Sequence, residues 1–478
     1  MTAKGGRRIA AGGIAAALTA VLLWLGTGLQ PLWPLLWLAP LPVLVFAAGA
    51  PWGTAAAVAA LSAAVSCFNL WQYLHVLLQL PAPLLVQLFG LEALGFAAAV
   101  LLYRALLRRG VAWGALLALP VTRVTIEYLV NLTSPHGTYG SFAYTQLGCL
   151  PLLQVASLTG PWGVSFLLLL FPATLATAWH LRATRTRAMQ VLLVGLGAIA
   201  AALVFGAARL ALSPDGPMVK VGLVASDAPA SPPVAAAGEP TAALVDAYAP
   251  HVLALAAQGA QVVVLPEKLG VAVDPGTGDL DARLQALADK TRVPLVAGLI
   301  HVATPHKYNA ARVFAPSAQV AEYHKRHMLP QFESMFAPGR ELVLLPRPSG
   351  PWGVTICKDM DFTPLSREYG LAGASLLLVP AWDFNLDRTL HGHMAVMRGV
   401  ESGFAIARAA KNGYLTVSDS RGRILAETRS DTAPFATLLA DVPAVHAATL
   451  YQRWGDWFAW LVLALLALIL VRLVWSPR

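Results

Sequence analysis

The sequence has few charged residues and very few cysteines. Only 12% of its 478 residues are charged, against about a quarter in an average soluble protein, which excludes a single soluble globule. The 3 cysteines, Cys67, Cys149 and Cys357, are too few for a disulfide framework. The formal net charge is +9, but no basic patch with interleaved aromatic residues accompanies it. Nucleic acid is therefore not an expected partner.

The sequence is instead rich in long hydrophobic runs, with 57% hydrophobic residues overall. About eight apolar segments are each close to the roughly 20 residues that cross the hydrocarbon core of a bilayer as a helix. Their approximate extents are 9–28, 32–50, 54–78, 84–107, 111–131, 161–181, 189–212 and 455–474. The sequence therefore predicts a polytopic α-helical membrane bundle of about eight spans, surrounded by membrane lipids.

The basic residues gather at the ends of these segments. They precede the first segment, follow the fourth and the sixth, and close the chain. With eight spans all four groups fall on one side, which the positive-inside rule makes cytoplasmic. Residues 213–454 would then face outward, and Trp454, Trp457 and Trp460 would anchor the last span at the interface.

Residues 213–454 have an ordinary soluble composition and alternate strand-like with helix-like patterns. The predicted strands are 219–225, 261–265, 294–301, 311–314, 353–357, 375–379 and 414–418, and the predicted helices are 240–258, 280–290, 366–370 and 391–403. This alternation favours an outward α/β domain whose sheet is covered by helices. The expected domains are residues 1–212 with seven spans, 213–454, and 455–478 with the last span.

Three reactive side chains of this domain follow strand-like runs: Glu267, Lys325 and Cys357. A thiol becomes a good nucleophile when a base takes its proton, and a cation stabilises the oxyanion that forms when the thiolate attacks a carbonyl. The three residues therefore suit acyl transfer through a thioester. Solvated charges beside a buried structural cysteine are an alternative that the residue chemistry alone leaves open.

The motifs around these residues are more specific than the residues themselves. Lys325 opens the stretch Lys-Arg-His-Met-Leu-Pro-Gln-Phe-Glu, which ends at Glu333, while Glu267 follows a proline and Cys357 an isoleucine. Further motif residues are Trp382, the run Met-Arg-Gly-Val-Glu at 397–401, Arg408 and Asn412-Gly413. This pattern resembles the carbon–nitrogen hydrolase (nitrilase) superfamily. The whole chain, with Tyr144-Thr145-Gln146 in its membrane half, resembles the apolipoprotein N-acyltransferase family within it.

The resemblance implies a nitrilase-like α-β-β-α sandwich and a reaction in lipoprotein biosynthesis. A fatty acyl chain would pass from a phospholipid, through a Cys357 thioester, to the N-terminal amine of a lipoprotein's diacylglyceryl-cysteine. Glu267 would be the general base and Lys325 the oxyanion stabiliser. Supporting residues would be Glu333 and Asp359, and substrate-binding residues Phe332, Phe336, Trp382 and Tyr144. No cofactor and no metal is implied, and the location would be a bacterial inner membrane with the catalytic domain on the periplasmic side.

The chain departs from the family pattern beside the nucleophile. Cys357-Lys358-Asp359 stands where the family usually has Cys-Tyr-Glu, which adds a cation next to the thiol. Pro330-Gln331-Phe332-Glu333 stands where it usually has Pro-Phe-Gly-Glu, so the loop lacks its glycine. Two other functions therefore stay open. The same three residues would serve a membrane-anchored amidase that passes its acyl group to water, and a catalytically inactive relative would act as a binding protein.

Three further features carry expectations of their own. The residues His324, His327, His391 and His393, with Asp359 and Asp361, match no known metal-ligand spacing, so no metal site is expected. Arg123 and Glu127 share one helical face, and either pair with each other or let Glu127 orient the following loop. The loop 331–339 carries Phe332, Met335 and Phe336. We expect this apolar loop to dip into the bilayer surface and gate acyl chains, unless it packs on the domain's own core.

Overall fold

The computed structural model describes residues 3–212, 216–227 and 234–475, and the chain forms two units. The first, which we call the membrane unit, comprises Met1–Thr133, Gly140–Ala211 and Asp456–Arg478. The second, which we call the sandwich unit, comprises Ser134–Tyr139 and Leu212–Gly455. The short segment Ser134–Tyr139 thus leaves the membrane half of the sequence and packs with the sandwich unit.

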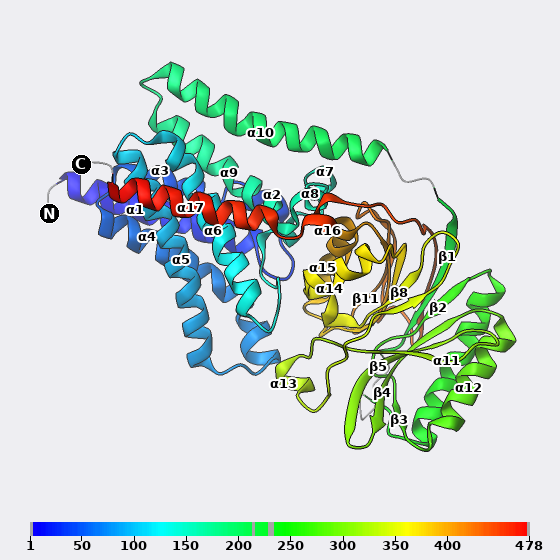
Figure 1. Ribbon diagram of the computed structural model, residues 1–478. Coiled ribbons are helices and arrows are strands. Elements are labelled where there is room, and N and C mark those ends of the chain that lie inside the picture. Colours follow the sequence, from blue (N-terminus) through cyan, green and yellow to red (C-terminus); the bar gives the residue numbers. More distant parts are fainter. Residues whose placement is uncertain (1–2, 213–215, 228–233, 476–478) are drawn as a thin grey trace. The chain divides into compact units, whose positions relative to one another are not determined.

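The membrane unit is a helical bundle (Figure 1). Within the described residues, 7 helices are long and apolar enough to cross a membrane. They are α1 (Ala3–Gly26), α4 (Trp52–Cys67), α5 (Ala82–Arg108), α6 (Ala112–Thr133), α9 (Pro161–His180), α10 (Arg185–Ala211) and α17 (Trp457–Trp475). The predicted polytopic membrane bundle is therefore confirmed.

Residues 32–50 do not form the single long span that the sequence predicted. They form two short helices, α2 (Trp33–Leu36) and α3 (Leu41–Gly49), each with a proline in its first turn. Proline has no amide hydrogen and is tolerated in a first turn but breaks a helix interior. The prolines therefore divide this apolar run, and 7 long apolar helices stand where about eight were expected.

The other short elements of the membrane unit connect its long helices. They are η1 (Phe68–Leu70), η2 (Gln72–Leu77), η3 (Phe142–Gln146), α7 (Leu150–Leu153) and α8 (Ala156–Thr159).

Glu127 is a buried charge in the interior of the membrane unit. Arg123 donates from Nε to Glu127 Oε1 at 2.9 Å and also pairs with Glu92. The other donors to the Glu127 carboxylate are the hydroxyls of Ser141 and Ser165, both at 2.8 Å, and the N–H of Phe142, at 3.1 Å. Both expected roles are thus present together, since the carboxylate pairs with Arg123 and also fixes the start of η3.

The sandwich unit is built on two β-sheets. One has 7 strands in the order β13-β1-β2-β4-β5-β6, with β3 paired to β4, and the other has 6 strands in the order β12-β11-β10-β9-β8-β7. The strands of the first are β1 (Met218–Ala225), β2 (Val262–Val264), β3 (Val271–Val273), β4 (Leu295–Ala303), β5 (His306–Phe314), β6 (Ala321–His324) and β13 (Ala436–Pro443). Those of the second are β7 (Val343–Leu345), β8 (Trp352–Val354), β9 (Leu376–Trp382), β10 (Ala405–Lys411), β11 (Tyr414–Ser418) and β12 (Ile424–Arg429).

Helices cover the outer faces of the two sheets. The helical elements of the unit are α11 (Glu239–Ala257), α12 (Thr277–Thr291), α13 (Pro330–Glu333), η4 (Cys357–Asp361), α14 (Thr363–Leu371), α15 (Arg388–Ser402) and α16 (Leu450–Trp454). One apolar core joins α11 and α12 to the first sheet, a second lies between the sheets, and a third joins α14 and α15 to the second sheet (Figure 1). The expected α-β-β-α sandwich is confirmed.

Parallel pairing within each sheet brings several strand ends to one place. β1, β2 and β4 are parallel neighbours in the first sheet, and β8, β9 and β10 in the second. Open α/β sheets carry their functional sites where the carboxyl ends of parallel strands meet. Glu267 follows β2, Cys357 follows β8, and Trp382 ends β9.

The fold predicts an unequal effect of two substitutions in the membrane unit. Glu127→Gln should lower the melting temperature of the solubilised protein more than Glu92→Gln, because an amide has a single acceptor oxygen and turns its NH2 toward groups that are themselves donors. Breaking a buried charge pair costs on the order of 3–5 kcal/mol, whereas the Glu92 side chain is 35% exposed. Thermal unfolding of both variants in one detergent checks this, and equal shifts would contradict it.

Candidate active site

Glu267 is held at the end of β2 by an unusually close approach of two chain segments. A Cβ atom on Gly298 of the neighbouring strand β4 would lie 2.4 Å from the Pro266 oxygen and 2.5 Å from the Glu267 Cα. Only glycine therefore allows this approach. The N–H of Gly298 donates to the Pro266 oxygen at 3.1 Å, and that of Glu267 donates to Ala381 of β9 at 3.3 Å. The carboxylate is thus fixed between the two sheets.

Lys325 lies between two buried carboxylates. Its Nζ donates to Glu267 Oε1 at 2.9 Å and to Glu333 at 2.8 Å and 3.1 Å, so all its hydrogens are directed at oxygen. All three side chains are at most 2% exposed. A buried ammonium group is stable only when opposite charges surround it in this way. The sequence-predicted residues Glu267, Lys325 and Glu333 are therefore brought together.

Two residues that sequence reasoning missed complete this cluster. The Asn309 amide, from β5, donates to Glu267 at 2.6 Å and to Glu333 at 2.9 Å. Lys268 donates to Glu333 at 2.6 Å and lies 3.7 Å from Glu267. Asn309 lies on a buried face of β5. A single sequence does not show whether a polar residue in a strand is buried or exposed, so the residue could not be identified in advance.

Cys357 lies on a sharp turn directly after β8. Its φ of +43° is in the left-handed region, and its Sγ lies 3.5 Å from the Trp382 oxygen, to which the thiol donates. A non-glycine residue keeps such a backbone angle only where its surroundings enforce it, and such residues cluster at functional sites. The first turn of η4 begins at Cys357, so the thiol projects from a strand-to-helix turn.

Asp359 ties the cysteine turn to the lysine loop. It is fully buried and accepts hydrogen bonds from the Tyr323 hydroxyl at 2.7 Å and from the N–H groups of Arg326 and His327 at 3.1 and 2.9 Å. These donors flank Lys325 on both sides. The aspartate therefore fixes the distance between the segments that carry Lys325 and Cys357.

Opposing electrostatic effects act on the reactive groups. Burial, followed by the Glu267 carboxylate, raises the pKa of the Cys357 thiol well above its ordinary value, and Lys325 opposes this rise. Burial alone would raise the pKa of Glu267, but Lys325 and Lys268 outweigh it and lower that pKa. Burial alone would lower the pKa of Lys325, but the two carboxylates raise it well above its ordinary value. The resting site therefore holds a thiol, carboxylates and an ammonium group.

Trp382 joins the cluster to a second set of charges. The Lys411 ammonium lies 3.7 Å from the centre of the Trp382 indole and donates to the Lys268 oxygen at 3.1 Å. Burial lowers the pKa of Lys411 to about 7. Beside it, Asp383 pairs with Arg408 through two hydrogen bonds, and both side chains are buried. Lys411 is a further residue that the sequence pattern did not reveal.

The remaining predicted site residues fall in different places. Phe332, in α13, is exposed and packs against Phe384 with ring centroids 5.5 Å apart, while Phe336 is partly buried. Tyr144 is buried in η3 of the membrane unit. The Lys358 ammonium, expected beside the thiol, instead contacts His136 Nδ1 at 3.2 Å and Asp361 at 3.4 Å. The lysine by which this chain departs from the family pattern therefore forms a buried ion pair with Asp361 and adds no cation beside the thiol.

The histidines considered as metal ligands do not gather as a group. His391 pairs with Asp387 and Asp361, and His327 with Asp359. Within the described part of the chain, the one set with suitable geometry is His301, Glu322 and His324, which includes one of the histidines considered. Arg312 also pairs with Glu322 at 2.7 Å, so a cation already neutralises this carboxylate.

Comparison with known proteins gives matches to both units. Residues 231–449 match the carbon-nitrogen hydrolase family, and residues 19–174 match the apolipoprotein N-acyltransferase N-terminal domain. The apolipoprotein N-acyltransferase of Geobacter metallireducens is 28% identical over 397 residues, which is 75% of this chain and 74% of that protein. That of Bradyrhizobium diazoefficiens is 27% identical over 449 residues, or 84% of this chain and 80% of that protein. A crystal structure of an amidase from Nesterenkonia sp. aligns with 49% of this chain and 94% of its own, at 21% identity and a TM-score of 0.41.

The electrostatics of the site predict how Cys357 titrates. Because the Glu267 carboxylate raises the pKa of the thiol and Lys325 lowers it, Glu267→Gln should move the midpoint of alkylation against pH downward. Lys325→Met should move it upward. Mass spectrometry of iodoacetamide labelling on the Cys357 peptide, in a Cys67→Ala, Cys149→Ala background, measures both midpoints. An upward shift in Glu267→Gln would refute the assigned influence of the carboxylate.

Proposed function

Because the chain belongs to the apolipoprotein N-acyltransferase family, we propose that it moves a fatty acyl chain from a phospholipid to the N-terminal amine of a lipoprotein's diacylglyceryl-cysteine. The observation that supports this most directly is the buried cluster of Glu267, Lys325 and Glu333 acting on the Cys357 thiol. That cluster contains a base, an oxyanion stabiliser and a nucleophile in one water-poor site. The expected location is a bacterial inner membrane, with the sandwich unit on the periplasmic side.

In the first half-reaction Glu267 takes the proton of Cys357 as the sulfur attacks the ester carbonyl of the phospholipid. The raised pKa of the thiol means that the proton must leave during the attack and not before it. The Lys325 ammonium stabilises the oxyanion. As Lys325 turns a hydrogen toward that oxyanion, its hydrogen bond to Glu267 weakens. The pKa of the Glu267 carboxyl then rises, so the carboxylate becomes a stronger base. The carbon–oxygen ester bond then breaks, Glu267 returns the proton to the leaving alkoxide, and a lysophospholipid departs from the Cys357 thioester.

In the second half-reaction the lipoprotein amine attacks the thioester carbonyl. Glu267 accepts a proton from the amine, Lys325 again stabilises the oxyanion, and the carbon–sulfur bond breaks. The proton on Glu267 then restores the Cys357 thiol, so the products are an amide and the free enzyme. Glu333 keeps Lys325 in place throughout, and Asn309 holds Glu267 and Glu333 at their spacing.

The thioester is the intermediate on which this function depends. Incubation of the full chain with phospholipid should leave a hydroxylamine-sensitive fatty acyl group on Cys357, detected by intact-protein mass spectrometry. Cys357→Ala should abolish the adduct, because no other thiol lies on this turn, while Cys67→Ala and Cys149→Ala should retain it. An adduct that survives Cys357→Ala would end the assignment.

The fate of the acyl group separates transfer from hydrolysis, since an amidase-type enzyme would use the same three residues. Adding a diacylglyceryl-cysteine peptide to the acylated protein should give an N-acyl peptide and discharge Cys357. Discharge to free fatty acid at the same rate with or without the peptide would identify a hydrolase. Absence of any adduct on the folded wild-type chain would support the inactive binding relative.

The loop after Lys325 supports a lipid substrate. Phe332 is 42% exposed and Met335 58% exposed, although both are apolar. Their exposure argues against the alternative that this loop simply packs on the domain's core. Glu333, which lies between them in the sequence, is buried against Lys325, so movement of the loop reaches the site directly. We therefore propose that the loop enters the bilayer surface and admits acyl chains.

The loop predicts a difference between two kinds of acyl donor. Phe332→Ser combined with Met335→Ser should slow acylation of Cys357 by a long-chain phospholipid about a hundredfold or more, because each lost side chain removes roughly 1.5–3 kcal/mol of apolar contact with lipid. Acylation by a short, soluble ester should change little. Leu371→Ser, at another exposed apolar position of the unit, is the matched control. Equal losses for both donors would show that the loop supports the site without handling lipid.

A further inference from the structure

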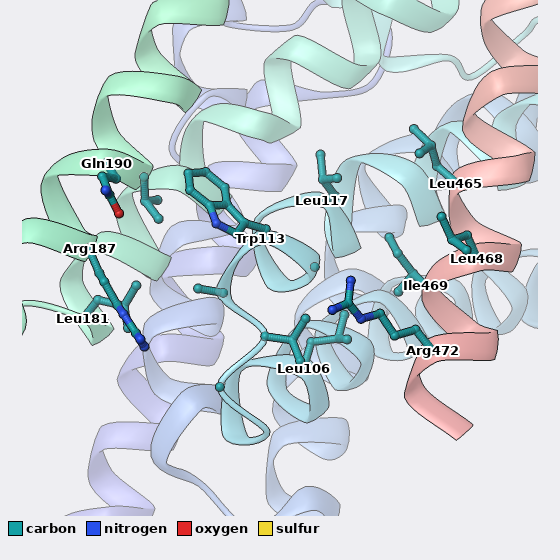
Figure 2. Close-up of a pocket in the computed structure, with 15 residues that line it drawn as sticks. Leu106, Trp113, Leu117, Leu181, Arg187, Gln190, Leu465, Leu468, Ile469 and Arg472 are labelled. Carbon is teal, nitrogen blue, oxygen red and sulfur yellow. The ribbon is translucent and has the colours of Figure 1, made fainter. Parts of the chain in front are cut away.

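A cavity of about 500 Å³ opens in the membrane unit among the ends of several helices. The turn between α5 and α6 forms its floor, the start of α10 one side, and the end of α17 the other (Figure 2). Its size falls within the range of small-molecule pockets, which is roughly 300–1,000 Å³. All of its lining residues belong to the membrane unit.

The lining combines an aliphatic wall with two cations. Leu465, Leu468 and Ile469 of α17 form the wall. Arg187 enters from α10 and Arg472 from α17, on opposite sides of the cavity (Figure 2). No acidic residue lines the cavity, and within the described residues neither guanidinium has a hydrogen bond or an ion pair. The cavity is therefore apolar along one side, and its described lining residues carry two positive charges and no carboxylate.

Two of the helices beside the cavity, α10 and α17, have few buried residues. Of the 7 candidate spans, α17 and α10 have the smallest buried shares, 11% and 22%. Trp113 lies between them and is exposed, as is usual for tryptophan at a membrane interface. The cavity between α10 and α17 leaves the apolar side chains of its wall without protein neighbours on one side, within the described residues. In a bilayer, lipid acyl chains fill such a space.

We propose that this cavity binds one anionic phospholipid as a structural lipid, with its headgroup facing the cations of the lining, Arg187 and Arg472, and an acyl chain along Leu465, Leu468 and Ile469. Guanidinium groups bind phosphate oxygens bidentately, so arginine suits a phosphate headgroup better than an ammonium group does. Net negative charge in the headgroup is needed because two cations face the site and no carboxylate does. The lipid would join α10 to α17, the two candidate spans with the smallest buried shares.

This site is distinct from the acyl donor site of the proposed function. No residue of the Glu267, Lys325 and Cys357 cluster lines it, and it needs no reaction at the thiol. Binding should therefore persist in Cys357→Ala, and failure of the acyl-transfer proposal would leave this one unaffected.

The test uses the full chain, stripped of lipid in a nonionic detergent, where no anionic membrane surface attracts basic residues in general. Native mass spectrometry and thermal unfolding should show one tightly bound phosphatidylglycerol with a raised melting temperature. Phosphatidylcholine should bind at least tenfold more weakly, and glycerol 3-phosphate, which has no acyl chain, should not stabilise the protein. Arg187→Gln combined with Arg472→Gln should weaken phosphatidylglycerol binding at least tenfold. Arg7→Gln combined with Arg8→Gln, which removes the same charge from α1, should leave it unchanged.

The proposal is overturned if the Arg187, Arg472 double variant binds phosphatidylglycerol as the wild type does, or if the α1 control loses as much. Equal binding of phosphatidylcholine, or equal stabilisation by glycerol 3-phosphate, also overturns it. A measurement on the wild type guards against a variant that fails to fold. Phosphatidylglycerol with a photoreactive acyl chain should label residues 465–469, and labelling confined to other segments rejects the site.

Discussion

The buried Lys325 ammonium group is the constraint on which the sandwich unit's candidate site depends. Removing a charge of this kind from water costs several kcal/mol unless opposite charges and hydrogen bonds surround it. Glu267 from one strand end, Glu333 from the following loop and Asn309 from a neighbouring strand meet this demand together. Because each comes from a different segment, the cluster also fixes where those segments lie. Loss of one carboxylate would leave an ammonium half-compensated in the interior.

The same charges set the chemistry of the thiol. Glu267 favours the neutral thiol and Lys325 the thiolate, so neither state of Cys357 is stabilised by both neighbours. In the proposed reaction the thiol therefore ionises only when a carbonyl is in place, which protects it from premature reaction. Asp359 keeps this balance fixed, since it binds the backbone beside Lys325 from the turn that carries Cys357. Lys358 has no part in it, because its ammonium group faces Asp361 and His136.

In the membrane unit, the buried charge of Glu127 is compensated by hydrogen-bond donors, whereas, among the residues that the structure describes, the charges of Arg187 and Arg472 are not. Glu127 is buried with four donors directed at its oxygens, so its charge organises the helix interior and η3. Arg187 and Arg472 are exposed at the helix ends and lack such partners within the described residues. In water an exposed arginine is solvated and needs no partner. Beside an aliphatic cavity in a membrane protein, these two arginines provide a reason for a lipid of opposite charge to bind.

Hydrophobic run length and strand-end motifs determined much of this protein from the sequence alone. Apolar runs predicted the helical bundle, and alternating patterns predicted an α/β domain covered by helices, while the α-β-β-α sandwich followed only from the resemblance of the motifs to a known family. The motifs at Glu267, Lys325, Glu333 and Cys357 identified side chains that do converge. The tertiary structure decided the rest. Prolines interrupted the apolar run at 32–50. Strand β10 was not predicted, because it carries the basic residues Arg408 and Lys411, whose side chains are buried against Asp383 and Trp382. Asn309 reaches Glu267 only because segments far apart in the sequence pair in one sheet. Periodicity reports which residues avoid water locally, whereas the partners of a buried polar group are set by chain segments far away in the sequence.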